Sequence, residues 1–537
     1  MFDGSAPRSP AGSGGERAFP HGIEMTSETM ICKHRNGPVV LVSRPIGFTF
    51  PLSYAYLAGY LREKHEDVRV LFKPGRKHIP ALVKEIMALD PLIVGFGNLY
   101  PELKEIGEII GMLDKAGRRF PIVIGGQMVS PIPEFAVTVT GADFGVIGEG
   151  EIVLWELVKA LRDGRDPSTV KGLAIRQGNQ VLLTGPGEYI QDLSILPSIP
   201  YDLFPEEKWL MIGRWYAENA FQPHWRLKDR VINIHGGRGC PFTCNFCYHH
   251  SKPRYRPVPL MMQEAAEALE RFNGNMLYFS DDLVMASPNR ARQLVEGIRS
   301  LNRPVEYSMS ARFDILHKID DGLLQELKNS GCRTMGLGVE SGSDRMLKVI
   351  GKNVTADMMK FDLERLRKTG ILPSVSIMVG QHTETMEDVE ASMDFVRETV
   401  RDNPNINYAF TITTPFPGTA LYNLIMKNGH LRDHKEFYDR YFAGRSEWNQ
   451  IVNLSEMSPE QVAFSHKKIL EIYNEEKRKK LKRAVIVLEK SQGILNRAVY
   501  ILRKYRITRM IPEKLDSSYS FILAGLEKHR LRLRGIG

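Results

Sequence analysis

The sequence predicts an α/β protein made of two successive parallel-sheet units and a helical C-terminal domain. Short apolar runs alternate with segments of helical apolar spacing over residues 37–163, and the alternation resumes with longer units from Asp229. After about Leu431 the pattern becomes helical and basic. Strand–helix alternation of this kind builds parallel strands joined by crossover helices, so the first unit is expected to be a doubly wound, Rossmann-like sheet.

In the first unit, apolar runs of strand length are followed by amphipathic segments of helix length. Predicted strands lie at 38–43, 68–72, 91–97 and 120–126, and predicted helices at 52–64, 79–90, 101–117 and 151–164. Ligands of such sheets bind at the carboxyl ends of the strands, where three pairs of glycines stand. These are Gly95 and Gly97, Gly125 and Gly126, and Gly148 and Gly150. A tight turn without a ligand explains any single pair equally well.

The other segments complete the expected division of the chain. A Gly-Asn turn within residues 172–185 predicts a hairpin, and the Pro-rich residues 193–205 predict a linker. Predicted strands of the second unit lie at 231–237, 276–282, 305–314, 334–343, 372–380 and 408–419, with helices at 289–301, 388–400, 436–442 and 458–480. The expected parts are a disordered leader (1–36), a first α/β domain (37–165), a hairpin and linker (166–225), a second α/β domain (226–430) and a basic helical domain (431–537).

Composition limits the class of protein. Of the five cysteines in 537 residues, three lie within eight residues, so a reducing, cytoplasmic setting is expected rather than a disulfide framework. No apolar run approaches the roughly 18 to 20 residues that span a bilayer. Residues 475–537 hold 17 Lys and Arg against 6 Asp and Glu. This basic end is either a solvated helical surface or a contact for anionic lipid heads, an acidic substrate or a partner; no nucleic acid is expected, because no RNA or DNA module accompanies it.

The most informative motif is Cys240-x3-Cys244-x2-Cys247. Three thiolates this close can bind three corners of a cubane iron–sulfur cluster from one loop. The fourth iron then lacks a protein ligand and can hold a substrate or cofactor, as an open metal site does. A zinc site that recruits His249 or His250 is the alternative explanation of this spacing.

This motif resembles that of the radical SAM superfamily, in which the open iron chelates S-adenosylmethionine (SAM). The segments IGGQMVS, GVIGEGE, FSDD, VESGSDR and TPFPGT accompany it in order. With them, residues 37 to 430 resemble the cobalamin-binding-domain radical SAM proteins, a family that includes class B-type methylases and the anaerobic magnesium-protoporphyrin ester cyclase group. The resemblance implies a cobalamin-binding first domain, a partial (β/α)6 TIM-like radical SAM barrel, and three cofactors: a [4Fe-4S] cluster, SAM and cobalamin.

The resemblance also implies site residues. The three motif cysteines would ligate the cluster. Expected SAM contacts are Ser280, Asp281, Asp282, Arg312, Glu340 and Ser341, and expected cobalamin contacts are Asn98, Gly125, Gly126, Gln127, Gly148 and Glu149. A carboxylate suits the SAM ammonium and an Arg its carboxylate, although a helix N-cap and a structural salt bridge explain the same residue types. The family's Asp-x-His-x-x-Gly motif is absent, so cobalamin would bind without a His ligand on cobalt.

The end of the fifth predicted barrel strand departs from the family pattern. Many relatives have Gly-x-Pro-Gly-Glu-Thr there, whereas in this chain the Pro-Gly is replaced, and Gln381 and His382 stand before Thr383 and Glu384-Thr385. His382 is the candidate catalytic residue, because a His can donate or accept protons near neutral pH; a lone His is more often structural.

The activity that the resemblance implies is C-methylation at an unactivated carbon by way of a 5′-deoxyadenosyl radical and methylcobalamin. A cyclase or carbon–carbon coupling enzyme acting on a tetrapyrrole or lipid is the alternative on the same scaffold. A non-catalytic metal-binding regulatory protein is the remote alternative. Expected partners are a small-molecule or lipid-like substrate, a one-electron donor such as flavodoxin or ferredoxin, and a membrane surface at the basic C-terminus.

Overall fold

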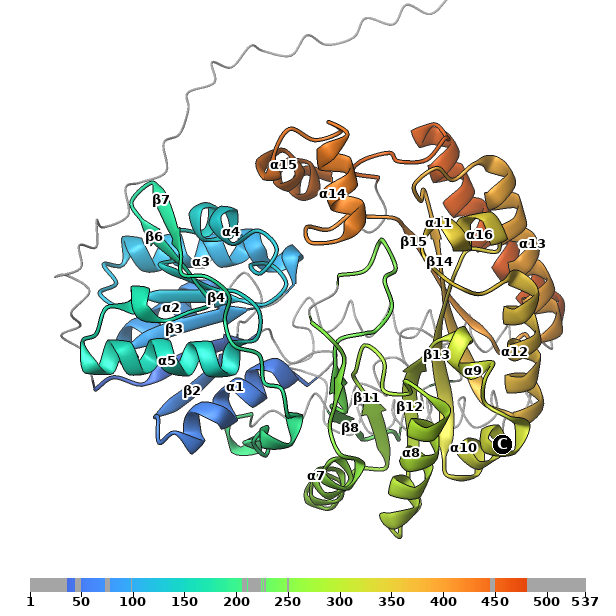
Figure 1. Cartoon of the computed structure of the whole chain (residues 1–537), viewed down its shortest axis with the longest axis horizontal. Helices are drawn as coiled ribbons and strands as arrows, with labels where there is room; N and C mark the ends of the chain where they lie inside the picture. The colour runs from blue at the N-terminus through green and yellow to red at the C-terminus, as the bar shows by residue number, and fades with distance from the viewer. Residues whose placement is uncertain are drawn as a thin grey trace, which may run out of the picture.

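Figure 1 shows the fold as a computed structural model. The structure describes residues 36–43, 50–72, 78–97, 99–204, 210, 224, 226, 228–248, 251–444 and 450–480. The expected disordered leader, Asn98, His249, His250 and the basic tail beyond residue 480 lie outside the described residues, so those predictions stay predictions. No helix in the described part is long and apolar enough to cross a bilayer.

The first domain is a seven-stranded sheet in the order β2-β1-β3-β4-β5-β6-β7. Its strands are β1 (Val39–Ser43), β2 (Val68–Phe72), β3 (Ile93–Gly97), β4 (Ile122–Gly125), β5 (Phe144–Val146), β6 (Leu173–Gln177) and β7 (Gln180–Leu183). The first five strands run parallel, and the hairpin β6–β7 adds to the edge in antiparallel pairing. The predicted doubly wound sheet is therefore confirmed, and the predicted hairpin extends the same sheet.

Helices cover both faces of this sheet. They are α1 (Leu52–Glu63), α2 (Ile79–Leu89), α3 (Leu103–Lys115), α4 (Pro133–Thr140) and α5 (Gly150–Asp163). Successive side chains of a strand point to opposite faces, so Val39 and Leu41 of β1 enter the core beneath α1 and α5, while Val40 and Val42 enter the core beneath α2 and α3. The sequence analysis missed α4 and β5, because β5 has three residues and the glycines around it read as turns.

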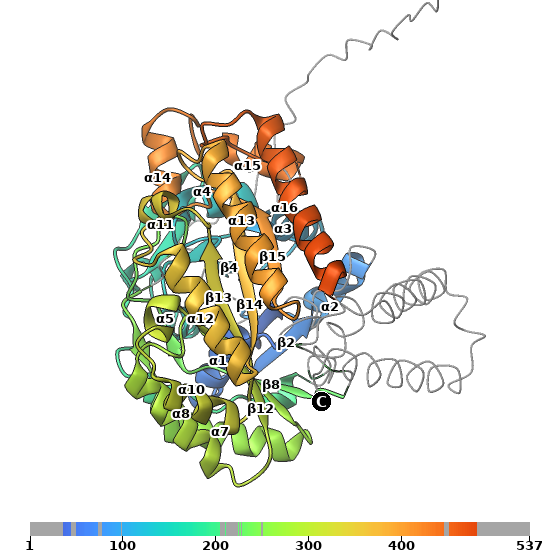
Figure 2. The same cartoon turned by 90° about the vertical axis from the view of Figure 1, so that its right-hand side faces the viewer.

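The second domain is an open, six-stranded parallel sheet in the order β15-β14-β13-β12-β11-β8. Its strands are β8 (Val231–Ile234), β11 (Met276–Phe279), β12 (Glu306–Ala311), β13 (Cys332–Glu340), β14 (Leu372–Val379) and β15 (Asn407–Ile412). Its helices are α7 (Val258–Arg271), α8 (Pro288–Ser300), α9 (Phe313–Leu316), α10 (Asp321–Asn329), α11 (Asp344–Val349), α12 (Ala356–Thr369) and α13 (Met386–Asp402). This is the expected partial (β/α)6 barrel, with its helices on the outer side (Figure 2).

Two short strands close the loop that follows β8. They are β9 (Gly237–Arg238) and β10 (Arg254–Tyr255), which pair in antiparallel fashion. The chain between them carries the three motif cysteines. The cysteine loop, residues 239–253, is thus a closed loop with a two-stranded neck at the end of the first barrel strand.

The C-terminal helices connect the two domains. They are α14 (Ala420–Lys427), α15 (His434–Gly444) and α16 (Pro459–Lys480). Helix α16 packs on α13 and β15 of the barrel. Buried residues of α14 and α15, such as Tyr422 and Phe437, share one apolar core with the first domain. Figure 1 shows α14 and α15 in orange across the top of the gap between the two sheets.

Candidate functional site

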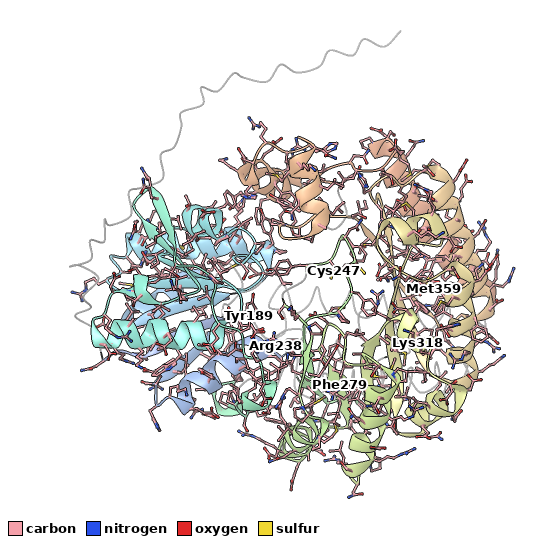
Figure 3. The ribbon with its side chains drawn as sticks, viewed as in Figure 1. Tyr189, Arg238, Cys247, Phe279, Lys318 and Met359 are labelled. Carbon is pink, nitrogen blue, oxygen red and sulfur yellow. The ribbon has the colours of Figure 1, made fainter. Side chains whose placement is uncertain are left out.

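The carboxyl ends of the two sheets face each other. The turn after β4 contains Ser130, and the turn after β5 contains Glu149; both contact the cysteine loop at the end of β8. Tyr248, directly after the third cysteine, hydrogen-bonds to Ser130. In Figure 3, Tyr189 and Arg238 lie where the domains meet, and Cys247 lies in the loop above them. Since ligands of parallel sheets bind at carboxyl ends, the ligand sites expected on the two sheets meet here.

The barrel fixes the middle of the cysteine loop. The backbone N–H of Asn245 donates to the carbonyl of Ile350, 3.2 Å away, at the end of α11. The backbone N–H of Leu421, in the first turn of α14, donates to the carbonyl of Asn245 at 2.9 Å. A short turn also joins the Cys247 N–H to the Cys244 carbonyl at 3.1 Å. Two helices therefore set the position of the Cys244–Cys247 segment.

The three thiols differ in exposure. Cys240 is half-buried, Cys244 is buried and Cys247 is exposed, and none of the three forms a disulfide within the described residues. Burial raises the pKa of Cys240, and burial followed by the negative charge of Asp282 raises the pKa of Cys247 to about 11. Arg312 donates from Nη1 to the Cys244 sulfur at 3.1 Å. Iron bound by Cys240 and Cys247 would take the place of their thiol protons, as metal binding to cysteine generally does.

This donor set fits an iron–sulfur cluster. Three thiols belong to one loop, and the guanidinium beside Cys244 supplies the hydrogen bond to sulfur that tunes such clusters. Within the described residues, no three His, Cys, Asp or Glu side chains are arranged to hold a single metal ion. The zinc alternative depends on His249 or His250, which lie outside that part of the chain.

The FSDD residues at the end of β11 have separate surroundings. Asp281 is buried, and its Oδ1 accepts the backbone N–H groups of Gly236 and Gly237 at 2.6 and 2.5 Å. Asp282 is exposed, and its charge acts on Cys240 and Cys247. The carboxylate available to a ligand beside the cysteine loop is therefore that of Asp282, while Asp281 holds the turn after β8.

The remaining side chain of this group is Ser280. Its hydroxyl is buried without a hydrogen-bond partner in the described structure. Its backbone N–H donates to the carbonyl of Ile234 at 3.0 Å, which ties the end of β11 to the end of β8. Ser280 thus offers an unused polar atom at the strand end.

Glu340 occupies a strained position at the end of β13. Its φ is +67°, a left-handed conformation that is uncommon for Glu, and the pairing register with β14 shifts there. Lys352 lies 3.4 Å from its Oε1, and Ser376 donates to its Oε2 at 3.1 Å. Gln381 donates from Nε2 to its backbone carbonyl at 3.0 Å. The Gln381 side chain therefore supports the strained backbone beside the site.

The other predicted residues of the barrel have mixed placements. Arg312 is paired with Asp314 at 3.0 Å in addition to its contact with Cys244. Ser341 is fully buried against Ser392, with 3.2 Å between their hydroxyl oxygens. His382 is half-buried in the turn that follows β14. The structure thus brings Asp282, Arg312 and the cysteines together and turns Ser341 into the core.

The predicted cobalamin residues line the carboxyl end of the first sheet. A Cβ on Gly97 would lie 3.4 Å from the carbonyl oxygen of Gly125, so the two glycines leave bare backbone side by side. Gly126 and Gly148 have φ of +83° and +87°, and the Gly148 N–H donates to the Ser130 hydroxyl at 3.0 Å. Such bare, turn-rich backbone suits close approach of a large planar cofactor.

Two further residues of the cobalamin group are in the same region. Gln127 is half-buried in the turn after β4. The carboxylate of Glu149 is paired with Arg238 and Arg254, at 3.3 and 2.5 Å. The side chain of Glu149 therefore binds the two arginines at the neck of the cysteine loop.

Comparison with known proteins agrees with this geometry. Residues 234–396 match the radical SAM superfamily, and residues 38–158 match the B12 binding domain. The chain belongs to the radical SAM enzymes that carry a B12-binding domain.

Relatives of this radical SAM enzyme match it across both domains. An uncharacterized methyltransferase of Pyrococcus horikoshii is 28% identical over 398 residues, which is 73% of this chain and 82% of the relative. The anaerobic magnesium-protoporphyrin IX monomethyl ester cyclase of Rubrivivax gelatinosus is 25% identical over 401 residues, 72% of this chain and 67% of the relative. The solved structure of the cobalamin-dependent SAM radical enzyme OxsB has a TM-score of 0.64 at 15% identity, covering 94% of this chain and 79% of that one.

Sequence reasoning missed several residues of the radical SAM enzyme's site. Arg238, Arg254, Tyr248 and Ser130 join the B12-binding domain to the cysteine loop, and none was singled out. The one sequence signal that could have indicated them is their nearness to the cysteines, since Arg238, Tyr248 and Arg254 all lie within eleven residues of a motif cysteine. Their partners lie about a hundred residues away in sequence, so the contacts themselves gave no local pattern.

Proposed function

We propose that the enzyme is a cobalamin-dependent C-methyltransferase that acts at an unactivated carbon. The observation that supports this most is the meeting of the two carboxyl edges, where Tyr248 of the cysteine loop hydrogen-bonds to Ser130 of the B12-binding domain. A reaction that uses both cofactors on one carbon needs them close to each other, because proximity replaces a diffusional encounter. The name of the Pyrococcus relative supports methyl transfer as the outcome.

When bound, the cluster and SAM supply a carbon-centred radical and cobalamin supplies the methyl group; the protein's own residues bind, orient and shield them. Cys240, Cys244 and Cys247 would hold the cluster, with Arg312 donating to the Cys244 sulfur. The exposed carboxylate of Asp282, beside the cysteines, would receive the SAM ammonium. The glycine-rich ends of β3, β4 and β5 would receive cobalamin.

The test begins with anaerobic reconstitution with iron, sulfide and hydroxocobalamin, followed by desalting. We expect a broad iron–sulfur absorption band and one cobalamin per chain, and loss of the band alone in a Cys240→Ala, Cys244→Ala, Cys247→Ala variant. With a strong one-electron reductant and methyl-labelled SAM, a methyltransferase of this kind forms both 5′-deoxyadenosine and S-adenosylhomocysteine. Protein that keeps the cluster but retains no cobalamin would contradict the proposal.

The Asp282 assignment has its own test. Asp282→Asn should weaken SAM binding to the reconstituted enzyme by at least about tenfold, since a charge-assisted hydrogen bond contributes roughly 1.5–3 kcal/mol. Asp357→Asn, at a carboxylate that is 98% exposed on the far helix α12, is the matched control and should bind SAM as the parent does. Equal binding by the Asp282 variant and the control would move the ammonium site elsewhere.

Cyclisation is the second candidate, and the magnesium-protoporphyrin ester cyclase relative is the observation that favours it. Cyclisation consumes SAM by radical cleavage and transfers no methyl group. Formation of 5′-deoxyadenosine without S-adenosylhomocysteine, and a product without an added methylene unit, would select this function over methyl transfer.

A further inference from the structure

The neck of the cysteine loop carries two arginines at facing positions. In the β9–β10 pairing, Arg238 lies directly opposite Arg254. Like charges at directly opposite positions repel each other and destabilise the pairing. Both side chains are also largely removed from water, with 15% and 11% of their surface exposed. The neck therefore needs negative charge from outside the loop in order to stay closed.

Two glutamates of the B12-binding domain supply that charge. Glu151, in the first turn of α5, accepts from Arg238 Nη2 at 2.5 Å. Glu149, the residue before α5, accepts from Arg254 Nη2 at 2.5 Å and lies 3.3 Å from Arg238 Nη1. The Glu151 and Glu149 side chains are 5% and 12% exposed. With the two arginines they form a largely buried ionic cluster between the domains. Pairs in such surroundings are screened little by salt.

The linker between the domains closes this cluster. The Ile190 N–H donates to Glu149 Oε2 at 3.1 Å, and Arg254 Nη1 donates to the Ile190 carbonyl. Arg254 also lies over the ring of Tyr189, 5.7 Å from its centroid. The neck is thus held by α5 on one side and by the linker on the other.

Cys240 and the other two cysteines are therefore held in place by different contacts. Asn245 anchors the Cys244–Cys247 segment to the barrel helix α11 and to the C-terminal helix α14. Cys240 instead follows Arg238 by two residues, at the neck. An open neck would move Cys240 away from the other two thiols, whose positions α11 and α14 fix.

We propose that Glu149 and Glu151 are positioning residues that hold the neck of the cysteine loop closed and so bring Cys240 into register with Cys244 and Cys247. The GVIGEGE turn then has two tasks. Its glycines lie at the ligand edge of the B12-binding domain, and its carboxylates hold the cluster loop. The three cysteines can then bind a cluster together only when the first domain is folded.

The test compares hydrogen exchange in cofactor-free protein. In Glu149→Gln, Glu151→Gln the amides of β9 and β10 should exchange at least about tenfold faster than in the parent, because Arg238 and Arg254 would then be buried without their carboxylate partners. Glu66→Gln is the matched control. Glu66 is similarly buried, and it pairs at 2.6 Å with Arg162, which lies at the C-terminal end of α5. This control should leave β9 and β10 unchanged.

A rescue variant and the cluster itself give independent readouts. Adding Arg238→Gln to the double variant removes the repulsion across the neck, so exchange of β9 and β10 should return toward the parent rate. After reconstitution, the double variant should show an altered cluster signal in electron paramagnetic resonance, while Glu66→Gln retains the parent spectrum. Equal behaviour of the double variant and Glu66→Gln would overturn the proposal. So would faster exchange throughout the first domain, which would make the glutamates general supports of its fold.

Discussion

At the residue scale, Asp281 and Asp282 show how adjacent carboxylates acquire different tasks. Both residues lie in the bend that follows β11. Asp281 turns inward there and accepts two backbone N–H groups, while Asp282 stays exposed beside the cysteines. Burial, opposed by the two N–H groups, raises the pKa of Asp281 to about 7.

Asp281 should make the stability of the cofactor-free protein depend on pH. Its folded-state pKa, about 7, lies above the ordinary value of 3.8, so the stability it contributes is complete below pH 3.8 and is lost as the pH rises through 7. A difference of this size corresponds to at most about 4 kcal/mol. The other charged groups near it are Asp282 and Arg290, and His235 is neutral over this range because burial lowers its pKa to about 3.

Asp281→Asn isolates this effect, because an amide oxygen can accept the same two N–H groups without titrating. We expect the melting temperature of the variant, relative to the parent, to rise steadily between pH 4.5 and pH 8. Asp357→Asn, at an exposed carboxylate, should follow the parent throughout. A constant difference between Asp281→Asn and the parent would show that Asp281 is ionised across the whole range.

At the element scale, the turns after the strands carry most of the site, and Gly418 shows how tightly they fit. This residue of the TPFPGT turn has a φ of +88°. A Cβ there would lie 2.4 Å from the Tyr248 ring and 2.7 Å from Pro131 of the first domain. Turn, cysteine loop and B12-binding domain therefore meet at a point with no room for a methyl group.

Gly418→Ala should destabilise the protein more than backbone strain alone explains. Gly429 is the matched control, with a φ of +74° and open space for 4 Å around the point that a Cβ would occupy. Both alanines incur about 1–2 kcal/mol for a left-handed conformation, and overpacking adds about 1–3 kcal/mol at Gly418 alone. Denaturant midpoints of the two variants measure the difference. Equal midpoints would mean that Tyr248 moves aside without cost.

The elements themselves were largely predictable from sequence, and the contacts between them were not. Apolar periodicity predicted the helices and the longer strands, since packing on one face leaves a regular trace. It missed β5, which has three residues. The cysteine spacing indicated the cluster loop, whereas the partners of Arg238 and Arg254 could not be predicted, because an ion pair between distant segments leaves no spacing to read. The inward turn of Asp281 also depends on the neighbouring strand end.

At the scale of the whole molecule, two of the contacts that join the domains in the described structure differ in kind. One is the charged neck of the cysteine loop. The other is an aromatic cluster around Tyr100, which follows β3 in the first domain. Its ring lies within 5.3 to 6.1 Å of four ring centroids from the β15 turn and α15, those of Phe416, Phe437, Tyr441 and Phe442. One contact is ionic and the other apolar, and because the charged side chains of the neck are largely buried, salt screens the ionic contact only weakly.

Tyr100 allows the apolar contact to be tested with two variants of opposite expected sign. The side chain is 2% exposed, and its hydroxyl is buried without a hydrogen-bond partner in the described structure. Tyr100→Phe removes an unsatisfied polar atom and keeps the ring, so it should leave stability unchanged or raise it by up to about 1–3 kcal/mol. Tyr100→Ala leaves a cavity between the domains and should cost about 3–5 kcal/mol. Thermal unfolding of the two variants beside the parent measures both effects. Loss of stability in Tyr100→Phe would show that the hydroxyl has a partner that holds the domains together, and the cluster would then be polar as well as apolar.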